Sequence, residues 1–153
     1  MRRSLGFTLI ELMVVVALVA LATAGVTLSL RDDGSTRLER EALRLSALME
    51  SARAQSRTSG LPVVWRSLPQ GFEFVGLPPL RSGAPSQDSL IGPRPWLSAD
   101  TVAQVIQPPG ALTLVLGPEP LIAAQRVVLQ QGDRRLTLAT DGISAFAVVA
   151  DAP

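Results

Sequence analysis

The chain has 153 residues, a formal net charge of +1, and neither cysteine nor histidine. The length allows one domain and an anchor, and the missing residue types exclude disulfides, cysteine-rich metal sites and the commonest general base. The sequence also has no glycine-rich phosphate-binding motif and no calcium-binding loop. We therefore expect a protein that is not an enzyme and has no cofactor, no metal and no nucleic-acid partner.

A long apolar run occupies residues 7–30 and follows two basic residues, Arg2 and Arg3. As a helix at roughly 1.5 Å per residue the run is about 36 Å long, enough to cross a hydrocarbon core of about 30 Å. The basic residues are expected to keep the N-terminus in the cytoplasm. The run therefore predicts a single transmembrane helix over residues 7–30.

One acid, Glu11, lies inside this apolar run. A charged residue costs about 2.5–3.5 kcal/mol at the centre of a membrane helix and less towards an end. The alternatives are a secretory signal peptide, with A-x-A cleavage sites at residues 20–22 and 22–24, a passive anchor, or a buried core helix. The apolar run is too long to suit a buried core helix, and a signal peptide or a passive anchor gains nothing from the acid, so Glu11 indicates a functional site that needs a partner.

The run GFTLIE at residues 6–11, after a short basic leader, resembles the class III signal of type IV pilins and pseudopilins. The resemblance implies a leader peptide over residues 1–6, which a prepilin peptidase removes by cutting between Gly6 and Phe7. It also implies that Phe7 becomes N-methylated. Glu11 is then expected to pair with the terminal amine of a neighbouring subunit, an interaction that a low dielectric strengthens.

The pattern changes after a polar break at residues 31–35, where an interruption or bend of the helix is expected. Thr36 and Glu39 have the spacing of a capping box, and apolar or small residues then recur at intervals of three and four. These positions are Leu38, Ala42, Leu45, Met49, Ala52 and Ser56. The spacing predicts an amphipathic helix over residues 36–58, which Gly60 and Pro62 end.

The charged residues of this helix are assigned to its exposed faces. Arg37 with Glu41, and Glu50 with Arg53, are spaced to pair along the surface for a few tenths of a kcal/mol. Residues 41–53 also carry the pattern E-x3-L-x2-L-x3-A-R, which resembles the corresponding helix of GspH-type subunits.

Residues 61–149 have the composition of a β-rich region that contains a proline-rich loop at residues 77–111. A short strand or helix is expected around residues 96–106 of that loop. Strands are expected at residues 61–66, 71–76, 112–116, 125–130, 134–140 and 143–149. Residues 67–70 join the first two strands as a pair, and turns at residues 132–133 and 141–142 join the last three. A helix packed on an antiparallel sheet gives an α+β, pilin-like head over residues 31–153.

Five residues of this region admit a structural and a functional interpretation. Trp96 fits a side chain that ties the long loop to the core better than a partner contact. Arg134 and Arg135 fit a solvated hairpin tip better than a DNA contact. Asp133 and Asp141 fit turn residues better than metal ligands.

The resemblance implies a minor pseudopilin of the type II secretion system, in the GspH family. Such a protein is a single-pass inner-membrane subunit whose head lies in the periplasm, where the pseudopilus drives export of folded proteins. Its partners are other pseudopilins, the prepilin peptidase and the inner-membrane assembly platform. A FimT-like minor pilin of a type IV pilus, serving adhesion, motility or DNA uptake, is the alternative. A soluble periplasmic domain released by signal peptidase I is the third hypothesis.

Overall fold

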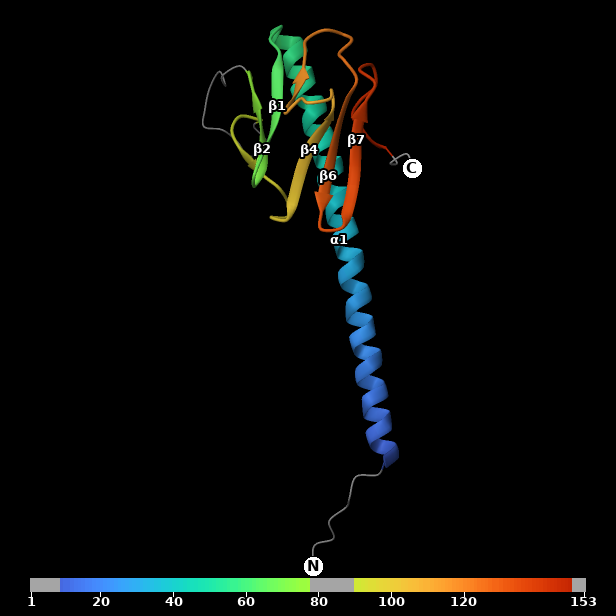
Figure 1. Ribbon diagram of the computed structural model, residues 1–153. Helices are drawn as coiled ribbons and strands as arrows, with labels where there is room; N and C mark the ends of the chain where they lie inside the picture. Colours follow the sequence, from blue (N-terminus) through green and yellow to red (C-terminus); the bar gives the residue numbers. More distant parts are fainter. Residues whose placement is uncertain (1–8, 78–89, 150–153) are drawn as a thin grey trace, which may run out of the picture. The chain divides into compact units, whose positions relative to one another are not determined.

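The computed structural model describes residues 9–77 and 90–149, with the side chains of residues 22–35 left out of that description. The chain divides into two compact units, residues 1–35 and residues 36–153. The first helix, α1, spans Leu9–Ser59 (Figure 1). The predicted leader, with Gly6, and the predicted methylated residue Phe7 lie outside the described residues.

Helix α1 is continuous through residues 31–35, so the predicted interruption is wrong, and the capping box at Thr36 lies within the helix. A glycine such as Gly34 costs only about 1 kcal/mol inside a helix. A break at that point forfeits several backbone hydrogen bonds and requires a second costly nucleation. The predicted end is confirmed, because Gly60 has a φ of 72° and its N–H donates to the Ser56 carbonyl at 2.9 Å.

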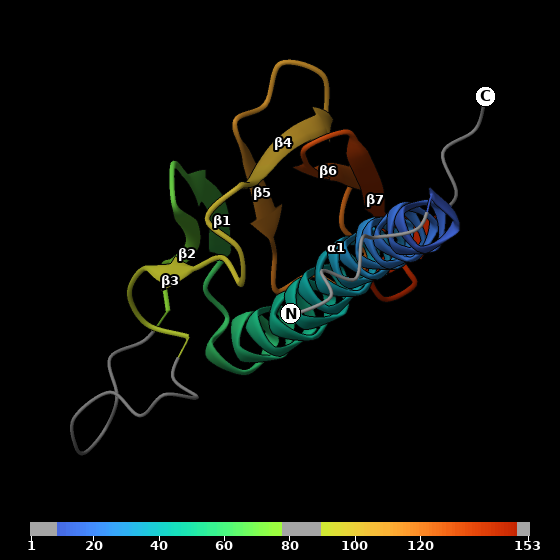
Figure 2. The ribbon, with the colours of Figure 1, turned by 90° about the horizontal axis from the view of Figure 1, so that it is seen from below.

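Within the described residues, eight strands form two antiparallel four-stranded sheets instead of one. The first sheet has the order β3-β2-β1-β5, and the second has the order β4-β6-β7-β8. The strands are β1 Val63–Leu68, β2 Gly71–Val75, β3 Arg94–Pro95, β4 Thr101–Gln107, β5 Thr113–Leu116, β6 Gln125–Gln131, β7 Arg134–Thr140 and β8 Ala147–Val149. Figure 2 shows the two sheets on the same side of the part of α1 that belongs to the head.

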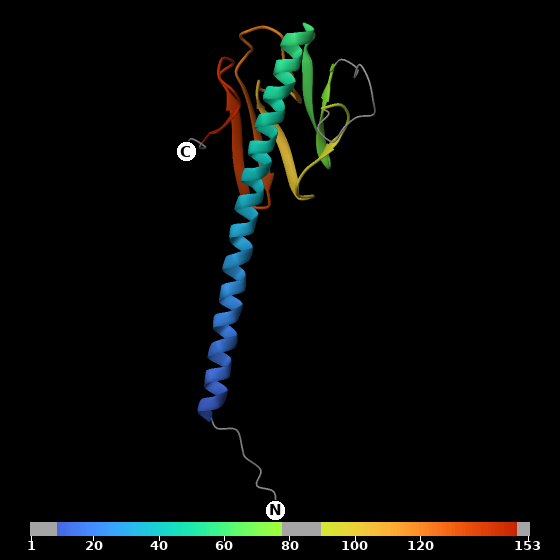
Figure 3. The same ribbon diagram turned by 180° about the vertical axis from the view of Figure 1, so that it is seen from behind.

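The apolar core lies between the second half of α1 and the inner faces of both sheets. All six positions of the predicted helix stripe are buried, each exposing 2% or less of its surface. The first sheet contributes Trp65 and Phe72, and the second contributes Leu129 and Leu138. Viewed from behind, this half of α1 crosses the region where the two sheets meet (Figure 3). The predicted amphipathic helix is therefore the element that joins the two sheets into one head.

Two predicted hairpins are confirmed and one strand is shorter than predicted. Strands β1 and β2 pair across a turn at Pro69 and Gln70, and β6 and β7 pair across Gly132 and Asp133. The strand predicted at residues 143–149 is reduced to β8, because residues 141–146 form a turn. The proline-rich region contains β3 and the seven-residue strand β4, while residues 78–89 lie outside the description.

Candidate functional site

The first described turns of α1 expose apolar side chains on every side. Between residues 9 and 21, ten large apolar side chains are exposed, from 47% at Val15 to 79% at Leu9. Because consecutive helix residues are about 100° apart at 3.6 residues per turn, the exposed run from Leu12 to Val16 covers the whole circumference. A helix that is apolar all round needs to be covered by other apolar groups.

Glu11 is the only charged residue between positions 9 and 30, and it lies in the first turn of α1. The positive end of the helix dipole favours an acid at that position. Its predicted partner is an amine on another subunit. The cleavage site Gly6–Phe7, the methylation of Phe7 and the charge pair of Glu11 therefore stay predictions.

In the part of the chain that the structure describes, no helix has both the length and the apolar character needed to cross a membrane. The transmembrane helix over residues 7–30 stays a prediction.

The head contains two charged residues that were predicted to be exposed and are buried. Glu41 and Arg53, assigned to exposed faces, each expose only 1% of their surface. The Glu41 carboxylate accepts a hydrogen bond from Arg44 at 3.1 Å and another from the Leu97 backbone N–H. Arg44 also donates to the Pro95 carbonyl at 3.0 Å. These contacts fix the segment that follows β3, where Trp96 packs on Phe72 with ring centroids 4.8 Å apart.

Arg53 joins two loops to the other end of the helix stripe. Its Nη2 donates to the carbonyl of Pro120 at 3.1 Å and to that of Gly142 at 2.7 Å. The two loops also touch each other, because the Ile122 N–H donates to the Gly142 carbonyl at 3.3 Å. Gly142 has a φ of 96°, and a Cβ there would lie 1.9 Å from the Ile122 oxygen. Only glycine fits this crossing point.

Between these ends, the helix binds the residue that precedes β8. The Glu50 carboxylate accepts a hydrogen bond from the Phe146 N–H at 3.1 Å, and the Ser46 hydroxyl donates to the Phe146 carbonyl. The predicted surface pairs of Arg37 with Glu41 and of Glu50 with Arg53 are therefore wrong. A charge removed from water needs nearby hydrogen-bonding groups, and the loop backbone supplies them.

A spacing signal for these buried charges is present in the sequence. Glu41, Leu45, Met49 and Arg53 recur every four residues, so both charges lie in line with core positions of the helix stripe.

The remaining predicted sites have structural roles. Trp96 is 6% exposed and belongs to the core, which confirms its interpretation. The Asp141 carboxylate accepts hydrogen bonds from the N–H groups of Ser144 at 2.7 Å and Ile143 at 2.9 Å, which lower the pKa of this carboxyl. Asp133 and exposed Arg135 lie at the β6–β7 hairpin end. The described residues contain no group of three or more acids placed to hold a metal ion.

Residues 1–27 match the family model described as the prokaryotic N-terminal methylation motif. No curated protein and no solved structure matches the chain. The motif is the prepilin signal of type IV pilin-like proteins, and the α+β fold of an N-terminal helix followed by antiparallel sheets agrees with it. Together they support a type IV pilin-like protein of a pilus or pseudopilus. The motif implies anchoring in the inner membrane, processing by a prepilin peptidase and assembly with other pilins.

Proposed function

We propose that the chain is a minor pseudopilin of the type II secretion system, in the GspH family, and that it acts as a structural subunit and not as an enzyme. The observation that carries the proposal is Glu11, which lies in the first turn of α1 and is the single charged residue of the apolar run over residues 7–30, within the methylation motif. An acid in such a setting needs a cationic partner. Cleavage after Gly6 would create one on each subunit, at Phe7.

The proposed mechanism is assembly by packing. The apolar residues 7–30 hold the processed subunit in the inner membrane and pack against the equivalent helices of other pseudopilins. Glu11 pairs with a neighbouring terminal amine and sets the register between adjacent helices. The head lies in the periplasm and contacts other subunits or cargo, while the assembly platform supplies the driving force.

Two features of the head support this role and this family. The buried charges Glu41 and Arg53 bond to loop backbone, so they serve to hold the head together. Residues 41–53, which carry the resemblance to GspH-type subunits, form the part of α1 on which both sheets pack.

The test compares a deletion strain with the same strain complemented with the full chain. The proposal expects the deletion strain to lose exoprotein secretion and to keep twitching motility. Loss of twitching or DNA uptake with intact secretion would instead support the FimT-like minor pilin. Sequencing the N-terminus of the mature protein separates both from a released domain: a start at Phe7 supports a pilin, and a start near Thr23 or Gly25 contradicts it.

A further inference from the structure

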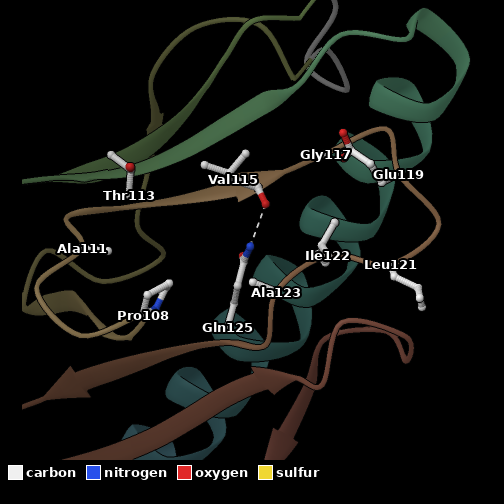
Figure 4. Close-up of a pocket in the computed structure, with 10 residues that line it drawn as sticks. All are labelled: Pro108, Ala111, Thr113, Val115, Gly117, Glu119, Leu121, Ile122, Ala123 and Gln125. Atoms are coloured by element: carbon white, nitrogen blue, oxygen red, sulfur yellow. Dashed lines mark hydrogen bonds between the residues drawn. The ribbon is translucent and has the colours of Figure 1, made fainter.

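A groove of about 460 Å³ lies between β5 and the loop that leads from β5 into β6 (Figure 4). One wall is formed by the outer edge of β5 and by Gly117, the residue that follows this strand. The other wall is formed by Leu121, Ile122 and Ala123, in the loop whose Pro120 carbonyl Arg53 holds. Both walls are therefore fixed by elements of the head: one by pairing with β1 and the other by a buried arginine.

The wall formed by β5 has the hydrogen-bonding groups of an open sheet edge. Strand β5 is the last strand of the first sheet, so alternate residues direct their backbone N–H and C=O away from β1. The Val115 carbonyl points into the groove, because it accepts a hydrogen bond from Nε2 of Gln125 at 2.6 Å across it (Figure 4). Thr113, two residues earlier, therefore directs its backbone groups the same way.

Gln125 lines this groove and has an unsatisfied acceptor. The residue is only 4% exposed, and its Oε1 is buried without a hydrogen-bond partner in the described structure. The orientation of the amide is settled, because the Val115 carbonyl requires the nitrogen side. A buried acceptor without a donor is unfavourable, so the groove gains from any ligand that supplies an N–H.

The rim of the groove is apolar except at one end. Val115 and Leu121, which line the groove, are 49% and 66% exposed, and Leu112, the residue before β5, is 86% exposed. Glu119 is the only charged residue among those that line the groove, and it is itself exposed. Exposed apolar side chains around a concave site are typical of a binding surface.

We propose that this groove binds an extended, apolar segment of another protein, which adds as a strand along β5 and places a basic side chain beside Glu119. The added strand pairs with the backbone of Thr113 and donates an N–H to Oε1 of Gln125, while its alternate side chains cover the apolar rim. The C-terminal residues 150–153 of this chain are a poor occupant, because Asp151 has the same charge as Glu119. The inference does not depend on whether the protein works in a pilus or a pseudopilus.

The experiment measures peptide binding to the full chain in detergent micelles by fluorescence anisotropy. The probe is a short peptide of alternating valine and threonine with an arginine at one end or the other. Two further variants of the peptide are N-methylated at alternate amides, one at the odd positions and the other at the even positions. Each of these two phases removes the hydrogen-bond donors from only one edge of the extended peptide. We expect one phase to weaken binding by about tenfold or more and the other to leave it unchanged, because only one edge faces β5.

Charge variants test the basic side chain. Glu119→Gln should weaken binding of the arginine peptide by about two- to fivefold, the size of an exposed ion pair. Glu119→Arg should transfer the preference to the same peptide with glutamate in place of arginine, and Asp133→Asn, an exposed acid at a distant hairpin, should change nothing. Equal loss of binding in both N-methyl phases, no binding of any probe, or tighter binding of a peptide of residues 147–153 would overturn the proposal. Secretion and twitching phenotypes are read separately, so failure here leaves the proposed function intact.

Discussion

The two described stretches of α1 side chains, residues 9–21 and residues 36–59, differ in how their apolar and charged side chains are exposed or buried. The first stretch exposes apolar side chains on every side and carries one acid, Glu11. The second has a single buried stripe with opposite charges, Glu41 and Arg53, in line with it and also buried. The buried polar side chains Glu41, Arg53 and Ser56 of the second stretch each form hydrogen bonds within the chain. The exposed apolar side chains of the first stretch need to be covered by other apolar groups.

The free energy of burying apolar side chains shows how much groups that cover the first stretch can contribute. Burying one Val, Leu, Ile or Met side chain gains about 1.5–3 kcal/mol. The ten large apolar side chains exposed between Leu9 and Leu21 therefore represent a large unused driving force, which lipid or neighbouring helices can satisfy. Lipid alone does not specify a register between subunits, whereas a charge pair does. Under the proposed function, the apolar residues therefore supply cohesion and Glu11 supplies alignment.

The largest effect is expected for Glu11→Ala. Removing one partner of a buried charge pair costs about 3–5 kcal/mol, because the other charge remains buried and unpaired. Leader removal should continue, while recovery of the variant with partner pseudopilins should fall more than about tenfold. The measurement is co-purification from cross-linked cells, with the mature N-terminus sequenced in parallel. Glu39→Ala, an exposed acid on the same helix, is the matched control. Equal recovery of the two variants would remove the pairing role from Glu11.

The N-terminal methylation motif could be predicted from the sequence alone because that signal is local. A glycine, an aromatic residue and an acid within residues 6–11 suffice to recognise it, and the family model matches the same region. The buried stripe of the second stretch was predicted for the same reason, since helix periodicity acts over a few residues. Both signals need no knowledge of what lies elsewhere in the chain.

The missed features all depend on contacts between distant residues. Arg53 is buried because carbonyls more than sixty positions away, those of Pro120 and Gly142, lie within reach of its guanidinium. Periodicity treats such a charge as exposed, although its alignment with Leu45 and Met49 was visible. The division of the strands into two sheets depends on pairings such as β1 with β5, which no local pattern encodes. The groove beside β5 exists only because of that division.

The next largest effect is expected for Arg53→Met, which keeps an unbranched side chain but removes the guanidinium donors. Two loop carbonyls lose a charged donor, and each such hydrogen bond contributes about 1.5–3 kcal/mol. The free energy of unfolding should therefore fall by roughly 3 kcal/mol or more. Urea unfolding of the full chain in micelles, followed by tryptophan fluorescence, measures it. Arg57→Met, exposed and one turn further along, should cost less than about 0.5 kcal/mol. A similar small cost for both would show that the loops are held by other contacts.

A smaller effect is expected for Glu41→Leu. The change leaves the part-buried N–H of Leu97 without an acceptor and removes the carboxylate partner of Arg44, at a cost of roughly 2 kcal/mol. Arg44 is partly exposed, so water compensates part of that loss. Glu41→Gln keeps an acceptor for Leu97 and should recover part of the stability in the same urea assay. If the two variants unfold at the same urea concentration, the acceptor for Leu97 is unimportant and the charge alone matters.

The smallest effect concerns Asp141, whose charge is satisfied locally and at the surface. The N–H groups of Ser144 and then Ile143 lower its pKa from the usual 3.8 in the folded chain. A carboxyl whose folded pKa is depressed stabilises the fold above the unfolded value and loses that contribution as the pH falls through the folded value. Asp141→Asn keeps an acceptor oxygen but does not titrate, so the variant should be slightly less stable than the wild type at neutral pH. That difference should vanish once the pH is lowered well below 3.8. Urea midpoints of both proteins across this range measure it, and a difference that persists unchanged in acid would show that the carboxylate charge does not stabilise the turn before β8.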